Sequence, residues 1–200
     1  MWAGVQQPLD GVITQVRIGP SVRCVKSPLL IVLAGRPGTG KTTLARALCA
    51  RLEAVYVRVD AIETAALRSG LSHPIGPLGY FVAHEVATSN LQLGRDVVVD
   101  GVNPVPEARS GWRETAHASG SALVQLETTL PDTNEHRRRV ENRVADMADQ
   151  MVPTWVEVTS REWVPWDPPR DGPRTVIDTT ALGDAVTTAL RACQAARLDR

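Results

Sequence analysis

Residues 29–44 read LLIVLAGRPGTGKTTL, and this stretch decides the fold. Leu29–Ala34 is an unbroken apolar run, which is the composition of a strand buried on both faces of a parallel sheet. GRPGTGKT at 35–42 fits the phosphate-binding pattern GxxxxGK[ST], and leucines spaced four residues apart follow from Leu44, as on one face of a helix. Strand, glycine loop and helix together predict a site for a nucleoside triphosphate.

The glycines of this loop allow backbone angles that a side chain would forbid, so the chain wraps closely around a phosphate. Successive N–H groups then form an anion nest, and the following helix adds its positive N-terminal end. We expect Lys41 to reach the β- and γ-phosphates and the Thr42 hydroxyl to ligate Mg²⁺. The residues predicted to bind the nucleotide here are Gly35, Arg36, Pro37, Gly38, Thr39, Gly40, Lys41, Thr42 and Thr43.

The length of 200 residues and the 43% hydrophobic content suit one domain, which we place at 29–200. Residues 1–28 form an N-terminal extension, either a hairpin of 12–18 with 22–25 or an arm. Basic and acidic residues balance at 22 each, which argues against a protein that grips long nucleic acid.

Three widely spaced cysteines favour reduced thiols over a disulfide framework. The apolar runs are too short to span a bilayer, and residues 1–28 lack a signal-peptide pattern. We therefore expect a cytoplasmic enzyme with no membrane partner; an oligomer remains open.

Strand and helix patterns alternate along the chain, which predicts an α/β fold with a parallel sheet. The expected strands are residues 29–34, 54–59, 96–99, 122–127 and 176–177. A helix is expected from about Leu78 to Leu93, and another from Pro131 to about Met147. The buried side of the first of these helices is predicted to be Leu78, Phe81, Val82, Val86 and Leu93. Trp112 is predicted to lie in the core.

Two carboxylates follow predicted strands on the edge of the sheet that carries the phosphate loop. Asp60, in VRVDAIE, is placed either to accept the proton of an attacking hydroxyl or to cap the next helix. Asp100, in VVVDGVN, fits the Walker B pattern, in which the carboxylate holds Mg²⁺. The sequence thus predicts a metal site of Thr42 and Asp100, although a short apolar run before an aspartate also occurs by chance.

The segment HRRRVENR at 136–143 supplies cations. Arg139 and Arg143 are four residues apart, so on a helix they share a face and can close over a triphosphate. The alternative is a solvated basic face paired with Glu135 and Glu141.

GRPGTGKT, VDAIE, VVVDGVN and HRRRVENR together resemble the P-loop kinases of the group that contains polynucleotide 5′-hydroxyl kinase, chloramphenicol phosphotransferase and zeta-type toxins. The resemblance covers roughly residues 29–180 and implies a P-loop NTPase three-layer sandwich with sheet order 2-3-1-4-5 and a helical lid. It implies that Asp60 is the catalytic base and that Arg139 and Arg143 are lid arginines. The Pro-Arg that follows the strand-end DG motif in nucleoside monophosphate kinases is missing, which argues against phosphate-bearing acceptors.

These observations favour an ATP- and Mg²⁺-dependent kinase that phosphorylates a hydroxyl of a small molecule, such as a natural product, an antibiotic or a nucleoside. Asp60, Lys41, Arg139 and Arg143 would be the catalytic residues. The acceptor is expected to enter between residues 70–79 and the helix around 80–93, near His84 and Glu85. The alternatives are a polynucleotide 5′-hydroxyl kinase, a zeta-like toxin kinase, and a nucleotide-dependent switch that is not a kinase. A polynucleotide kinase would need a basic channel, and Arg68 is the only Arg or Lys in residues 60–94, which argues against that alternative.

Overall fold

The computed structural model describes residues 27–72 and 74–198, so the suggested hairpin within 1–28 lies outside the described residues. The strands are β1 (Leu29–Ala34), β2 (Val55–Arg58), β3 (Val97–Asp100), β4 (Ala122–Thr129) and β5 (Thr175–Asp178). The helices are α1 (Lys41–Leu52), α2 (Val59–Arg68), α3 (Leu78–Gln92), α4 (Pro106–Ser119), α5 (Thr133–Glu141), α6 (Trp155–Ser160), α7 (Pro168–Asp171) and α8 (Leu182–Leu198).

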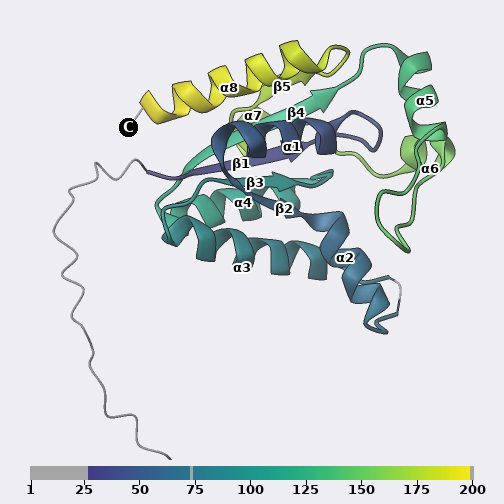
Figure 1. The fold of residues 1–200 in the computed structure, drawn as a ribbon, viewed down its shortest axis with the longest axis horizontal. Helices are drawn as coiled ribbons and strands as arrows, with labels where there is room; N and C mark the ends of the chain where they lie inside the picture. The colour runs from purple at the N-terminus through teal and green to yellow at the C-terminus, as the bar shows by residue number, and fades with distance from the viewer. Residues whose placement is uncertain (1–26, 73, 199–200) are drawn as a thin grey trace, which may run out of the picture.

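The five strands form one parallel sheet in the order β2-β3-β1-β4-β5, which confirms the predicted fold class and strand order (Figure 1). All six residues of β1 are buried, as its unbroken apolar run requires of a central strand. The register sets Asp100 of β3 beside Leu33 of β1 and Arg58 of β2. The strand ends that carry polar residues therefore meet at one edge, where β1 passes into the phosphate loop.

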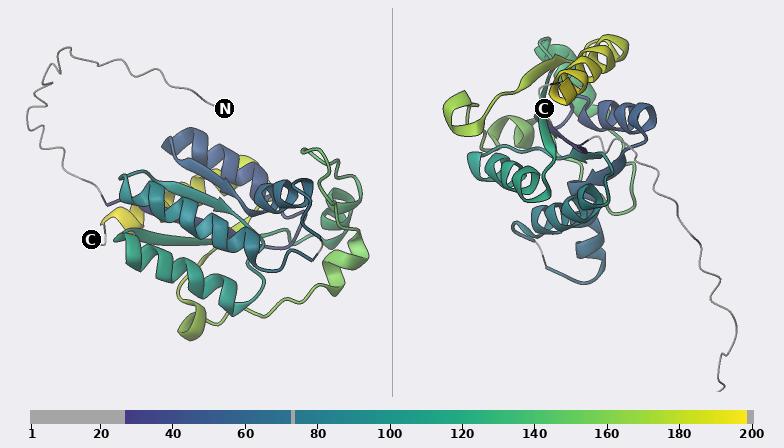
Figure 2. Two further views of the ribbon diagram at one scale, coloured as in Figure 1. Left: turned by 90° about the horizontal axis from the view of Figure 1, so that it is seen from below. Right: turned by 90° about the vertical axis from the view of Figure 1, so that its left-hand side faces the viewer.

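Helices cover both faces of the sheet, and the result is three layers. α1 and α8 pack on one face, and α3 and α4 pack on the other (Figures 1 and 2). Trp112 of α4 is fully buried in the second of these cores, as predicted. No helix in the described part of the chain is long and apolar enough to cross a membrane.

The predicted buried side of α3 is wrong. Phe81 is 66% exposed and Leu93 is 77% exposed, and Val82 and Val86 are exposed as well. A stripe of smaller residues packs inward instead, at the four-residue spacing of a helix face: Gly79, Ala83, Ala87 and Leu91. Small side chains let the helix approach its neighbours closely, and at Gly79 an added Cβ would lie 2.5 Å from Cγ of Glu63.

α5 ends at Glu141 and does not continue to Met147 as predicted. Arg143 lies beyond the helix, so it does not share a helix face with Arg139, and Val144 is 82% exposed. The chain bends because Asp146 forms ion pairs with Arg46 and Arg58 on α1 and β2. α5, α6 and the segment between them lie beyond the carboxyl edge of the sheet, at the right of Figure 1.

A tight turn after β3 holds the phosphate loop in place. The Gly35 N–H donates to the Val102 carbonyl at 3.1 Å. Asn103 adopts a left-handed backbone (φ 50°), donates from Nδ2 to the Leu33 carbonyl at 2.7 Å, and accepts from Nε1 of Trp112 at 2.8 Å. Both backbone and side chain of this turn therefore bond to the end of β1.

Candidate functional site

A cavity of about 1060 Å³ opens at the carboxyl edge of the sheet, above the N-terminus of α1. It brings together most of the site residues that the sequence predicts. Those that line it are Pro37, Gly38, Gly40, Lys41, Thr42, Thr43, Asp60, Asp100, Arg139 and Arg143.

Gly38 and Gly40 adopt left-handed backbones, with φ of 84° and 81°. Gly40 is also the N-cap of α1, and no side chain caps the helix there, so the first N–H groups of α1 remain available to an anion. The Lys41 ammonium donates to the carbonyls of Gly35 at 2.7 Å and Arg36 at 2.9 Å. Burial lowers the pKa of Lys41 to about 8. The loop therefore has the uncapped donors and buried cation that a phosphate site needs.

Gly35, Arg36 and Thr39 belong to the loop but do not line the cavity. Thr39 Oγ1 donates to the Arg36 carbonyl at 2.7 Å, which closes the loop on itself. The Arg36 guanidinium donates to the Val158 carbonyl of α6 at 2.6 Å and lies 5.2 Å from the centre of the Trp163 ring. These side chains fix the shape of the loop and do not reach into the cavity.

α5 rests directly on the phosphate loop. His136 donates from Nε2 to the Pro37 carbonyl at 2.8 Å. Val140 covers Gly38 so closely that a Cβ at position 38 would lie 2.5 Å from its Cγ2. The loop and α5 therefore form one packed unit.

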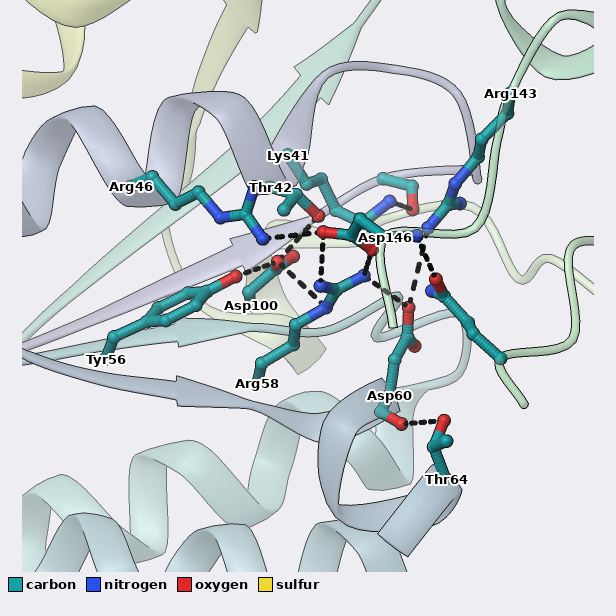
Figure 3. Close-up of polar contacts among 12 residues, drawn as sticks. Lys41, Thr42, Arg46, Tyr56, Arg58, Asp60, Thr64, Asp100, Arg143 and Asp146 are labelled. Carbon is teal, nitrogen blue, oxygen red and sulfur yellow. Dashed lines mark hydrogen bonds and ion pairs between the residues drawn. The ribbon is translucent and has the colours of Figure 1, made fainter. Parts of the chain in front are cut away.

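Thr42 and Asp100 lie together, as the predicted metal site requires. The Thr42 hydroxyl donates to Asp100 Oδ2 at 2.7 Å, and the Tyr56 hydroxyl donates to the same oxygen at 2.8 Å (Figure 3). Burial, with Asp100 nearby, raises the pKa of Tyr56, so it remains a donor. No three His, Cys, Asp or Glu side chains of residues 27–72 and 74–198 cluster to hold a metal. The hydroxyl oxygen of Thr42 and the carboxylate oxygens of Asp100 are hard ligands that fit Mg²⁺, an ion usually bound by one or two protein oxygens together with phosphate oxygens and water.

Asp60 lies inside the first turn of α2, because β2 ends at Arg58, one residue earlier than predicted, and the helix begins directly afterwards at Val59. The N-cap of α2 is Arg58 and no side chain caps the helix, so Asp60 is not a capping residue. Its carboxylate faces the cavity and lies 3.8 Å from Nη2 of Arg58 and 4.0 Å from Nη2 of Arg143 (Figure 3).

The four arginines of 136–143 divide into two groups. Arg137 and Arg138 pair with Glu141 and Glu135 and are more than half exposed, as the solvated-face alternative expects. Arg139 and Arg143 line the cavity. Arg139 donates to Glu135 at 2.8 Å and to the Thr179 carbonyl at 3.3 Å.

A cluster of charges that the sequence did not reveal lies beside Asp100. Buried Arg58 makes two hydrogen bonds to Asp146, and Arg46 of α1 donates to Asp146 at 2.6 Å. Asp146 is 88 residues from Arg58, and no motif marks either residue. Glu63 and Arg161 also line the cavity without having been predicted, and burial beside Asp60 raises the pKa of Glu63.

The family model described as "AAA domain" matches residues 30–159 of this chain. A cytidylate kinase of Corynebacterium efficiens is 28% identical over 130 residues, which cover 62% of this chain and 54% of that relative. The chain therefore spans about half the length of the curated relative that it matches.

Solved structures share the fold at low identity. A protein of Chloroflexus aurantiacus is 22% identical, with a TM-score of 0.66 and coverage of 86% of this chain and 98% of that one. Kti12 of Chaetomium thermophilum, in complex with ADP-AlF3, is 19% identical, with a TM-score of 0.64 and coverage of 83% and 98%. A gluconokinase of Sinorhizobium meliloti 1021 is 19% identical, with a TM-score of 0.58 and coverage of 87% and 96%.

Proposed function

This chain belongs to the AAA domain family, and we propose that it is an ATP-dependent kinase that transfers the γ-phosphoryl group to a hydroxyl of a small molecule. The observation that carries the proposal is one cavity that holds a phosphate loop at one wall and the carboxylate of Asp60 at another. Within the family, we place the chain in the group of polynucleotide 5′-hydroxyl kinase, chloramphenicol phosphotransferase and zeta-type toxins, with residues 29–200 as the kinase domain.

In this proposal, the phosphate loop and the N-terminus of α1 bind the triphosphate. Lys41 leaves its two carbonyl partners for the β- and γ-phosphates, and binding there favours the protonated ammonium. Thr42 and Asp100 would hold Mg²⁺, which when bound neutralises charge on the phosphates. These groups make up the donor half of the site.

Asp60 accepts the proton of the acceptor hydroxyl as its oxygen attacks the γ-phosphorus. The bond from the γ-phosphorus to the bridging oxygen breaks, and ADP leaves with the electron pair. Arg143, 4.0 Å from Asp60, lies where it can stabilise charge on the transferred group, and Arg139 supplies a second cation at the cavity wall.

The names of two similar proteins support a small acceptor. They include a gluconokinase and a cytidylate kinase, and neither name refers to a long polymer. A nucleotide-dependent switch would need the phosphate loop but would not need a carboxylate at position 60. The effect of replacing Asp60 therefore distinguishes the kinase from the switch.

The test is transfer of label from γ-labelled ATP to a panel of alcohols, sugars, nucleosides and 5′-hydroxyl oligonucleotides, with Asp60→Asn as the variant. We expect wild-type protein to label a small alcohol, and Asp60→Asn to lose at least about a hundredfold in kcat while still binding nucleotide. Asp184→Asn, in the first turn of α8, is the matched control and should keep full activity.

Two results would count against the proposal. If wild-type protein binds ATP but labels no acceptor, the switch function replaces the kinase. If Asp60→Asn labels an acceptor as fast as wild type does, the kinase stands but Asp60 is not its base.

A further inference from the structure

A second cavity, of about 1030 Å³, lies along α3 and α4. It joins the first cavity at the proposed base, because both are lined by Asp60 and by four further residues. The four are Glu63, Gly76, Val102 and Arg161. A molecule with its hydroxyl at Asp60 can therefore extend away from the phosphate loop into this space, which we name the acceptor groove.

The floor of the acceptor groove is apolar. Its lining includes Val59, Phe81, Val105 and Ala108. Phe81 was predicted to be buried, but its side chain is exposed. Exposed apolar surface that lines a groove beside an active site is typical of ligand contact.

Two polar side chains on the floor are held in fixed positions. The Tyr80 hydroxyl accepts the Asn103 N–H at 3.0 Å, and its own proton has no acceptor among the residues that the structure describes. His84 bonds through Nδ1 to Thr115 Oγ1 at 2.8 Å, and its ring centre lies 3.8 Å from that of Trp112. Gly111 makes room for this ring, since a Cβ there would lie 2.8 Å from Nε2. The floor thus offers pre-positioned hydrogen-bonding groups on an apolar surface.

The charges around the acceptor groove have one dominant sign. Six carboxylates line it, against the single guanidinium of Arg161 among the described residues. The six are Asp60, Glu63, Glu85, Glu107, Glu114 and Glu162. Burial lowers the pKa of His84, so the imidazole adds no positive charge at neutral pH. A negatively charged body would meet like charges along the groove, whereas a cationic body would be attracted.

We propose that the acceptor groove binds the body of the phosphoryl acceptor, and that this acceptor is an alcohol with an apolar skeleton and a positively charged amino group. The inference rests on the proposed function for the position of the hydroxyl at Asp60. The apolar floor takes the skeleton, and two of the lining carboxylates, Glu85 of α3 and Glu114 of α4, take the amino group.

Three matched probes test the charge preference: 8-amino-1-octanol, 1,8-octanediol and 8-hydroxyoctanoate. Their chains have equal length and one hydroxyl end in common, so the other end alone carries the difference. Each is titrated into the protein without nucleotide by calorimetry, and each is then offered as an acceptor with ATP. We expect the amino alcohol to bind about tenfold more tightly than the diol, and the hydroxy acid to bind most weakly.

The double variant Glu85→Gln/Glu114→Gln should reduce the preference for the amino alcohol over the diol about tenfold and leave diol binding within twofold. Glu53→Gln, at the C-terminal end of α1 and outside both cavities, is the matched carboxylate control and should change nothing. Ala108→Phe, which fills the groove floor, should weaken all three probes.

The proposal is overturned if the hydroxy acid binds as well as the amino alcohol, or if the amine preference survives in the double variant. The two proposals fail in different ways. Amine binding that depends on Glu85 and Glu114, without phosphorylation of any alcohol, would support the groove proposal and contradict the kinase proposal. Phosphorylation of alcohols with no preference for the amine would support the kinase proposal and contradict the groove proposal.

Discussion

Arg58 and Asp146 are 88 residues apart in the sequence, yet their side chains form two hydrogen bonds of 2.9 and 3.0 Å. Arg58 is buried at the end of β2, and its Nε lies 4.0 Å from Asp100 Oδ2. Hydrogen bonds from Arg58, together with one from Arg46, lower the pKa of Asp146 to about 2, so its carboxylate is ionised at neutral pH. This contact ties the segment after α5 to the sheet edge beside the predicted metal site.

Replacing Asp146 by Asn should release that segment, because the amide keeps the size of the side chain and loses its charge. We expect trypsin to cleave after Arg143 about tenfold faster than in the wild-type protein. Asp149→Asn is the matched control, since Asp149 lies in the same segment and its partner Arg68 is 3.7 Å away at an exposed position. Equal cleavage rates for the two variants would show that Asp146 does not hold the segment.

Lys41 should make nucleotide binding depend on pH. Its pKa of about 8 in the free protein means that the ammonium loses its proton above this pH, while bound phosphates favour the protonated form. Affinity for ATP should therefore be flat below about pH 7 and fall by up to about tenfold per pH unit above pH 8. Calorimetry at pH 8.5 in two buffers of different ionisation enthalpy should detect proton uptake on binding.

Lys41→Met supplies the control for this measurement, since it should bind weakly and show no such uptake. Absence of proton uptake in the wild-type protein at pH 8.5 would mean that Lys41 keeps its proton in the free protein.

The buried pair of Arg109 and Asp171 should contribute strongly to stability. Both side chains are 1% exposed, their closest atoms are 2.9 Å apart, and Arg109 also donates to three backbone carbonyls. Arg109→Met should lower the free energy of unfolding by about 3–5 kcal/mol, because it leaves buried acceptors without a donor. Urea denaturation measures this loss.

The exposed pair of Arg137 and Glu141 is the matched comparison for that loss. Arg137→Met should change the free energy of unfolding by less than about 1 kcal/mol. A loss below about 1 kcal/mol for Arg109→Met as well would show that the buried pair is not stabilising.

Asn103 combines a left-handed backbone with two side-chain hydrogen bonds, and two substitutions separate these contributions. Asn103→Gly removes the side chain and keeps the favoured backbone, and we expect a loss of about 2–4 kcal/mol. Asn103→Ala adds the cost of a left-handed alanine and should lose about 1 kcal/mol more. Equal losses by urea denaturation would show that the backbone of this turn carries no strain.

The sequence allowed correct prediction of the sheet and of the loop because both depend on local patterns. An unbroken apolar run at Leu29–Ala34 requires burial on both faces, and glycines at fixed spacing before Lys41 require a tight turn into a helix. Asp60 and Asp100 could be placed at the same edge because parallel strands align their carboxyl ends.

The wrong predictions concern the buried face of α3 and the end of α5, which depend on tertiary contacts. α3 carries both a stripe of large apolar residues and a stripe of small ones, and close contact with neighbouring elements selects the small stripe at Ala83 and Ala87. Periodicity alone could not choose between these two faces. Arg143 was placed on a helix because the apolar residues Val140, Val144 and Met147 continue a helical spacing, whereas α5 ends at Glu141 and Asp146 pairs with Arg58 of β2. A pairing across 88 residues leaves no local signal.

The contact of Val140 with Gly38 also constrains how this chain can vary in evolution. A side chain at position 38 would strike Val140, so an exchange there requires a smaller residue at position 140 in the same protein. The hydrogen bond from His136 to the Pro37 carbonyl is a second contact by which a change in α5 would affect the phosphate loop. The phosphate motif and α5, which are a hundred residues apart in the gene, are therefore expected to change together in related sequences.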